Sequence, residues 1–166
     1  SITQPKIIKQ IHEEFLEAGA DIIETNTFSS NKIAQDDYNL GTIIHDLNFI
    51  SAKIAKEAAK KFSSKEKPRF VAGAIGPTNR TASISPDVED PSFRSITFDQ
   101  LRISYKEQIL ALIDGGIDLI LIETVFDTLN CKAALYATQE AFELLKIRLP
   151  IMAVSYTHLT LPTIRL

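Results

Sequence analysis

Short apolar runs rich in β-branched residues alternate with longer segments of helical periodicity along this sequence. Apolar residues spaced three and four apart predict helices over 5–18, 42–62, 97–114 and 127–144. After each of them a short apolar run predicts a strand, at 21–28, 69–75, 118–125 and 151–154. Because a helix separates each strand from the next, hairpins are excluded and the sheet should be parallel. The predicted fold class is therefore α/β.

One part of the chain nearly repeats another, which favours a barrel over an open sheet. Residues 17–25 and 114–124 each run from a helix end through a glycine turn and an aspartate into an apolar strand that closes on Glu-Thr. No Gly-x-Gly-x-x-Gly follows any predicted strand, so the dinucleotide fingerprint of open doubly wound sheets is absent. A (β/α)8 barrel typically takes about 250 residues. A chain of 166 residues with four strands therefore predicts a partial TIM barrel.

Charge and composition exclude several classes of partner. Eighteen basic residues against 21 acidic ones give a net charge of −3, which does not favour nucleic-acid binding. No apolar run approaches the roughly 20 residues of a membrane helix, and the first residues lack the apolar core of a signal peptide. The single cysteine, Cys131, excludes an internal disulfide and is expected to be a small neutral filler. We expect a cytoplasmic protein with no membrane partner.

Polar residues follow three of the predicted strands at the point where each strand ends. They lie in segments 24–27, 76–80 and 123–124. In a parallel α/β fold these ends gather at one edge, where ligands bind. Two carboxylates, Glu24 and Glu123, could then hold an ammonium group, or they could merely cap or bridge neighbouring strands. The functional interpretation is favoured because ionised carboxylates after apolar strands need partners.

The segment 76–96 has no regular pattern, and structureless connections of this length in compact domains are often functional. Its three prolines restrict the backbone, so we expect an ordered loop. Four charged residues in this loop are interpreted as internal salt bridges in preference to a ligand-binding set: Arg80, Asp87, Asp90 and Arg94. His12, within the first predicted helix, is expected to be partly buried and not a ligand.

Three segments together resemble one known family. IIETNTF (22–28), GPTNRTASISPDVEDPSFRSITFD (76–99) and LILIETVFDTLN (119–130) resemble the homocysteine-binding domain of cobalamin-dependent methionine synthases. The long middle segment is the specific part, because related zinc-dependent homocysteine methyltransferases share only the strand ends. The resemblance extends over residues 2–153 and implies a (β/α)8 barrel, of which this chain would hold about the second to fifth strands.

The resemblance also implies a function and a set of site residues. In that family a zinc ion binds the homocysteine sulfur, and the thiolate takes a methyl group from methylcobalamin to make methionine. Other modules of the parent chain carry the cobalamin and the folate. Glu123 matches the carboxylate that would hold the homocysteine ammonium. The remaining expected substrate-binding residues match the ends of two earlier strands: Glu24, Asn26, Thr27, Gly76 and Pro77. The resemblance assigns no catalytic residue within this chain.

Two departures from the family shape the expectation for this chain. The family's zinc cysteines follow the fifth strand, so none is expected here, and Cys131 matches none of them. The chain alone is therefore expected to be inactive. Residues 154–166 (VSYTHLTLPTIRL) resemble a translated sequencing-library adaptor, which would confine the barrel domain to 1–153; the alternative is a native strand with period-two alternation.

Two other functions stay open at this point. The chain could belong to another small-molecule barrel enzyme, such as a lyase that uses Glu24 and Glu123 as acid and base. It could also be a truncation product without a function of its own. Half a barrel would have unpaired strand edges and an open apolar interior, which predicts aggregation.

Overall fold

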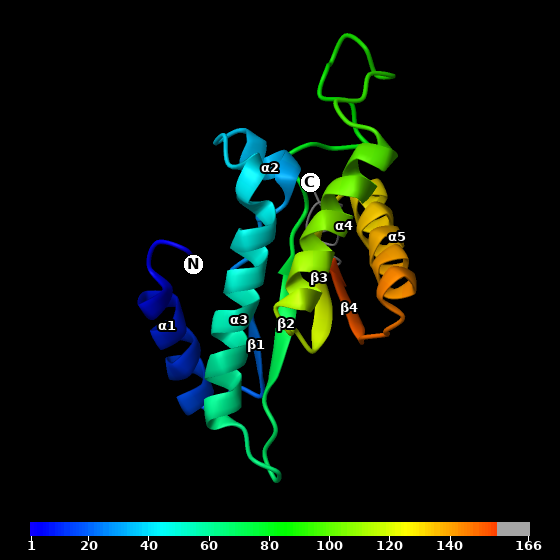
Figure 1. Cartoon of the computed structure of the whole chain (residues 1–166). Coiled ribbons are helices and arrows are strands. Elements are labelled where there is room, and N and C mark those ends of the chain that lie inside the picture. The colour runs from blue at the N-terminus through cyan, green and yellow to red at the C-terminus, as the bar shows by residue number, and fades with distance from the viewer. Residues whose placement is uncertain (156–166) are drawn as a thin grey trace, which may run out of the picture.

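The computed structural model describes residues 1–155, in which four parallel strands alternate with helices (Figure 1). The strands lie side by side in chain order: β1 (Ile22–Glu24), β2 (Phe70–Ile75), β3 (Leu119–Val125) and β4 (Ile151–Ser155). The helices are α1 (Pro5–Glu17), α2 (Lys32–Asp36), α3 (Ile44–Phe62), α4 (Phe98–Asp114) and α5 (Thr128–Leu145), with a short 3-10 turn η1 (Gly41–Ile43) before α3. The predicted α/β class with a parallel sheet is confirmed. Of the suspected non-native tail, residues 156–166 lie outside the described range.

The described helices cover one face of the sheet, and we call the opposite face the open face because none of these helices packs on it. The helices α1, α3, α4 and α5 pack against one another in that order along the covered face (Figure 1). The main core lies beneath these helices and takes alternate side chains from the strands: Ile23, Val71, Ile75, Ile120 and Ile122. Ala72, Leu119 and Leu121 form a separate small cluster. Phe70 is 41% exposed and Met152 is 46% exposed. Within residues 1–155, the face opposite the helices is therefore apolar, buried at Ala72, Leu119 and Leu121 and exposed at Phe70 and Met152.

Glycines in the left-handed region end α1 and α4 and confirm the internal repeat. Gly19 has a φ of 109° and Gly116 a φ of 93°, a region that residues with a side chain rarely adopt. An aspartate follows each glycine by two positions. The Asp118 carboxylate accepts a hydrogen bond from the backbone N–H of Val71 at 2.8 Å, which ties the start of β3 to β2. The two repeats thus share one helix-to-strand turn.

Side-chain caps set where the helices begin. Thr97 and Gln100 form the predicted capping box at the start of α4, with the Gln100 backbone N–H donating to Thr97 Oγ1 at 3.2 Å. The sequence analysis did not predict α2, a five-residue helix. Asn31 caps it by accepting a hydrogen bond from the Ala34 N–H at 2.9 Å. The sequence of α2 offers a polar capping residue but no long apolar stripe, so its pattern was too weak to predict a helix.

The first strand is shorter than predicted, because two threonine hydroxyls replace its backbone pairing. The run 21–28 was expected to be one strand, but β1 ends at Glu24. Beyond it, Thr25 Oγ1 accepts a hydrogen bond from the Ala74 N–H at 3.0 Å, and Thr27 Oγ1 donates to the Ala74 carbonyl at 2.7 Å. The chain therefore stays attached to β2 while its backbone turns away.

Two buried side chains at the start of α5 hold the first part of the long connection after β2, where the sequence analysis expected an ordered loop. Both oxygens of the Asp127 carboxylate accept hydrogen bonds from the loop: the N–H groups of Ala82 and Ser83 donate to Oδ2 at 2.9 Å, and the Ser83 hydroxyl donates to Oδ1 at 2.8 Å. Asn130 Oδ1 accepts the Thr78 hydroxyl at 2.9 Å. Asp127 also caps its own helix, and its side chain is almost fully buried.

The predicted internal salt bridges of the loop form only in part. Arg80 forms a salt bridge with Asp37, next to the end of α2, at 3.1 Å, as predicted. Arg94 donates to the backbone carbonyls of Pro91 and Phe93. Asp90 accepts hydrogen bonds from the backbone and side chain of Ser92, and those bonds lower the pKa of its carboxyl. Neighbouring loop residues thus satisfy the charges of Arg94 and Asp90, which the sequence analysis assigned to salt bridges. No described helix is long and apolar enough to cross a membrane.

We predict that Asp127→Asn destabilises the protein by about 1–3 kcal/mol at neutral pH. Both carboxylate oxygens of Asp127 accept hydrogen bonds from backbone N–H groups. In either orientation of the asparagine side chain, its amide nitrogen would therefore face an N–H donor. Burial raises the pKa of Asp127, but the hydrogen bonds from Ser83, Asn130 and Ala82 outweigh it and hold the pKa below its ordinary value. The stabilisation is therefore present above about pH 4 and is lost as the pH falls through the folded-state pKa.

Urea unfolding of wild type and variant across this pH range measures the effect. The control is Asp87→Asn in the same loop, where an exposed carboxylate accepts only one backbone N–H, that of Glu89, and an amide oxygen can replace it. Equal losses in the two variants, or a loss at position 127 that does not shrink in acid, would contradict the prediction.

Candidate functional site

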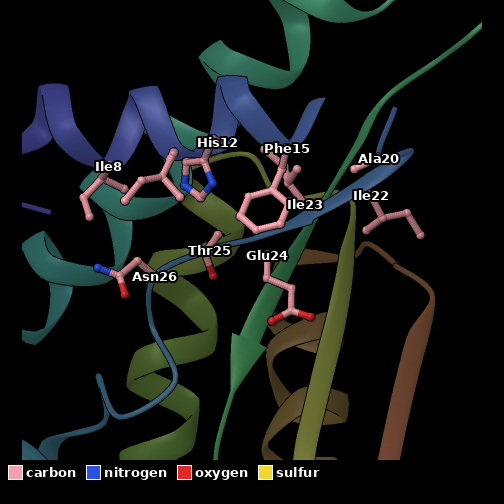
Figure 2. A pocket seen from close by; sticks show the side chains of 10 residues that line it. Ile8, His12, Phe15, Ala20, Ile22, Ile23, Glu24, Thr25 and Asn26 are labelled. Atoms are coloured by element: carbon pink, nitrogen blue, oxygen red, sulfur yellow. The ribbon is translucent and has the colours of Figure 1, made fainter. Parts of the chain in front are cut away.

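The structure brings the two predicted carboxylates to one hollow at the carboxyl ends of the strands. Glu24, from the end of β1, and Glu123, from β3, both line a space of about 340 Å³ on the open face of the sheet. Leu121 and Met152 form its apolar floor. Figure 2 shows Glu24 on the side of β1 away from His12 and toward the neighbouring strands.

The two carboxylates make the hollow electrostatically negative, and the pKa of Glu123 is raised within it. Burial raises the pKa of the Glu123 carboxyl, and the negative charge of Glu24 raises it further. Both effects disfavour the ionised form, so a cation placed against Glu123 relieves them. An ammonium group fits this requirement, because it neutralises the charge and donates hydrogen bonds to carboxylate oxygens. The raised pKa is equally what a general acid would need.

The other two predicted residues from the first strand end lie differently. Asn26 is exposed at the rim of the groove between α1 and β1, as Figure 2 shows. Thr27 is buried, and its hydroxyl lies 2.6 Å from Thr25 Oγ1 while donating to Ala74. That hydroxyl therefore holds the frame of the site together. A direct contact of Thr27 with substrate stays a prediction.

Gly76 and Pro77 bring the end of β2 beneath the site. The Gly76 N–H donates to the Phe28 carbonyl at 3.0 Å, and a Cβ at this position would lie 2.7 Å from that same oxygen. Only glycine permits so close a crossing of two chain segments. Pro77 lines a narrow crevice next to Glu123, on the side facing α5. These two residues therefore shape the site, and a direct contact with substrate stays a prediction for each.

A buried network beneath the hollow fixes these strand ends. The Tyr105 hydroxyl of α4 lies 2.9 Å from Asn130 Oδ1 and 3.2 Å from the Gly76 carbonyl, and it accepts the Thr78 N–H at 3.1 Å. Burial raises the pKa of Tyr105 far above its usual range, so the hydroxyl stays protonated and works as a structural donor. Side chains from α4 and α5 thus hold the end of β2 in place beneath the site.

The sequence analysis missed two features near the site. His12 is 7% exposed, more buried than expected, and burial lowers the pKa of its imidazole. It lies on the apolar face of α1 between Ile8 and Phe15, in a groove of about 470 Å³ along β1 (Figure 2). Its place on that apolar stripe was the available signal. The second feature is Thr124, whose φ of 57° no sequence pattern announced.

The described residues do not fit a zinc site. Burial raises the pKa of Cys131, which supports its interpretation as a neutral thiol. Within residues 1–155, no three His, Cys, Asp or Glu side chains lie close enough together to hold a metal ion.

Comparison with known proteins identifies the family. The family model for homocysteine S-methyltransferase matches residues 1–162. Among solved structures, the Escherichia coli homocysteine methyltransferase MmuM matches in its metallated form with a TM-score of 0.69 and 19% identity, over 90% of this chain and 51% of that one. Its oxidised form matches with a TM-score of 0.69 and 18% identity, over 92% and 51%. Its apo form matches with a TM-score of 0.58 and 18% identity, over 90% and 49%.

These matches settle the fold and the family separately. At such low identity the structural likeness shows the fold, which is that of a partial TIM-barrel-like domain. The chain spans about half the length of the solved structures it matches. The family model extends over nearly the whole sequence. This chain belongs to the homocysteine S-methyltransferase family.

Proposed function

We propose that this chain forms the amino-acid-binding part of an enzyme that methylates homocysteine to methionine. The observation that carries the proposal is the hollow at the strand ends, where Glu24 and Glu123 create negative potential on an apolar floor. Homocysteine presents a cationic ammonium and an aliphatic chain, and these two features match that hollow. In this proposal Glu123 contacts the ammonium, and Glu24 adds negative charge from across the hollow.

Binding and orientation are the contributions of the described residues. An ammonium against Glu123 stabilises the ionised carboxylate and lowers its pKa, so the ligand and a proton compete for the same group. The Tyr105 and Asn130 network keeps the neighbouring strand end in place without taking part in proton transfer. The substrate sulfur would then point away from the carboxylate pair, because the ammonium and the thiol lie at opposite ends of homocysteine.

The methyl donor and the metal are the finer parts of this proposal. Methylcobalamin as donor is supported by the resemblance of segment 76–99 to cobalamin-dependent methionine synthases, and so are partner modules for cobalamin and folate. Zinc would supply thiol activation, since a coordinating metal ion deprotonates a thiol. The described residues do not form a metal cluster, so ligands for it would come from elsewhere in the enzyme.

One observation favours a second candidate function. The raised pKa of Glu123 beside a second carboxylate is also typical of an acid and base pair. In that alternative, Glu24 and Glu123 would move protons on a small substrate within the barrel. The two functions differ in what the ligand must carry: the binding role requires a cationic group, and the acid–base role does not.

We predict that the chain binds L-homocysteine and L-homoserine with similar affinity but binds 4-mercaptobutanoic acid at least about tenfold more weakly. The last compound lacks only the ammonium, and a hydrogen bond to a charged group contributes about 1.5–3 kcal/mol. Isothermal titration of wild type and of Glu123→Gln measures this, and the variant should bind the three compounds with similarly low affinity. Glu143→Gln, on the exposed side of α5, is the matched control. Equal affinities of the wild type for all three compounds would contradict the ammonium-binding role.

A second prediction concerns stability. Because the folded-state pKa of Glu123 is raised, its ionisation opposes folding, and stability is lost as the pH rises through that pKa. Glu123→Gln should therefore raise the free energy of unfolding at pH 7, by less than about 1 kcal/mol since the group is partly exposed, with no gain near pH 4. Denaturant unfolding at both pH values checks this. A variant less stable than wild type at pH 7 would refute it, and Glu143→Gln again serves as control.

A further inference from the structure

The residue after Glu123 adopts a backbone conformation that is unfavourable for its type. Thr124 has a φ of 57°, in the left-handed region. Among residues with side chains, β-branched ones are rare there, because their Cβ substituents crowd the backbone. Such conformations persist only where the surrounding structure enforces them, and they cluster at binding sites. Thr124 therefore calls for a functional explanation.

The pattern of β3 shows what this conformation changes. Along the first four residues the side chains alternate: Leu119 and Leu121 face the open side, and Ile120 and Ile122 join the core under the helices. Continued alternation would place Glu123 on the open side, Thr124 under the helices, and the next residue on the open side again.

The observed arrangement departs from that alternation at Thr124. Glu123 and Thr124 both line the hollow on the open face, whereas Val125 packs against the same core as Ile122. The register agrees: Ile122 lies opposite Ala153, and Val125 lies opposite Ser155. Three steps along β3 thus match two steps along β4. The extra residue is a β-bulge, a device that re-aims side chains near active sites.

We propose that this bulge turns Thr124 into a second ligand-binding residue, one that contacts the α-carboxylate of an amino acid whose ammonium is held by Glu123. Two consecutive side chains then face one ligand, a placement that regular alternation forbids. The pairing follows from chemistry: Glu123 accepts hydrogen bonds from a cation, and the Thr124 hydroxyl can donate one to an anion. This inference rests on the proposed function and adds the recognition of the carboxylate.

A pair of ligands and a pair of variants test the contact with the carboxylate. Thr124→Val removes the hydroxyl and keeps the shape, and Thr124→Ser keeps the hydroxyl. We expect Thr124→Val to weaken L-homocysteine binding about five- to tenfold, in line with the loss of one hydrogen bond to a charged group. It should leave the affinity for 3-aminopropane-1-thiol, which lacks only the carboxylate, unchanged. Thr124→Ser should keep both affinities within about twofold, and Glu123→Gln should weaken both ligands.

The outcomes separate this inference from the proposed function. If wild type binds both ligands and Thr124→Val weakens them equally or not at all, the carboxylate contact is wrong while the ammonium site stands. If wild type binds neither ligand, the proposed function fails, and the carboxylate contact fails with it. A loss confined to L-homocysteine supports the inference, because a general structural defect would weaken both ligands.

The bulge itself is tested without any ligand. At an ordinary position alanine is more stabilising than glycine, whereas at a left-handed residue the order reverses. We expect Thr124→Gly to melt roughly 2–4 °C above Thr124→Ala. The control pair is Thr128→Gly and Thr128→Ala at the start of α5, where alanine should melt higher. Thr124→Ala melting above Thr124→Gly would overturn the strained bulge.

Discussion

Parallel pairing brings the carboxyl ends of neighbouring strands to the same edge, and every feature of the candidate site depends on that constraint. In the register, Glu24 lies opposite Ala72, and Ala72 lies opposite Leu119, so these residues share one face of the sheet. Polar residues that follow these strands must therefore meet on the open face, beyond the small apolar cluster. Side-chain hydrogen bonds then refine what the pairing dictates, because Thr25 and Thr27 extend the attachment of β1 to β2 after the strand ends.

The parts of the fold that sequence could predict are those with a repeated physical signal. The strand β2 is an apolar run, β3 begins with one, and both lie between helices of clear periodicity; the capping box at Thr97 is a local motif. Early termination of β1 could not be predicted, because Thr25 and Thr27 look like ordinary strand residues until their hydroxyls are seen to bond Ala74. The family resemblance indicated the strand-end residues but did not distinguish ligand contacts from supports.

The site and its support differ in what they contribute to stability. The pKa of Asp127 is lowered and the pKa of Glu123 is raised, although both are carboxylates on the same chain segment. Asp127 meets backbone N–H groups that satisfy its charge, so its ionisation favours folding. Glu123 meets burial and another carboxylate, so its ionisation opposes folding. A charge left unsatisfied by the protein is available to a ligand, and this contrast supports the proposed binding role of Glu123 beside the structural role of Asp127.

The bulge at Thr124 follows the same logic in the backbone. The sequence of β3, LILIETV, contains no glycine, so it gives no sign of a residue in the left-handed region. Regular strand pairing would have placed the Thr124 side chain under the helices. Thr124, with its strained backbone, and Glu123, with its raised pKa, both line the same hollow. The described residues line that hollow only from the open face of the sheet. Binding there must draw on charge and hydrogen-bond geometry more than on enclosure. This geometry therefore determines how much affinity a ligand loses when one charged group is removed, more than it determines the absolute affinity.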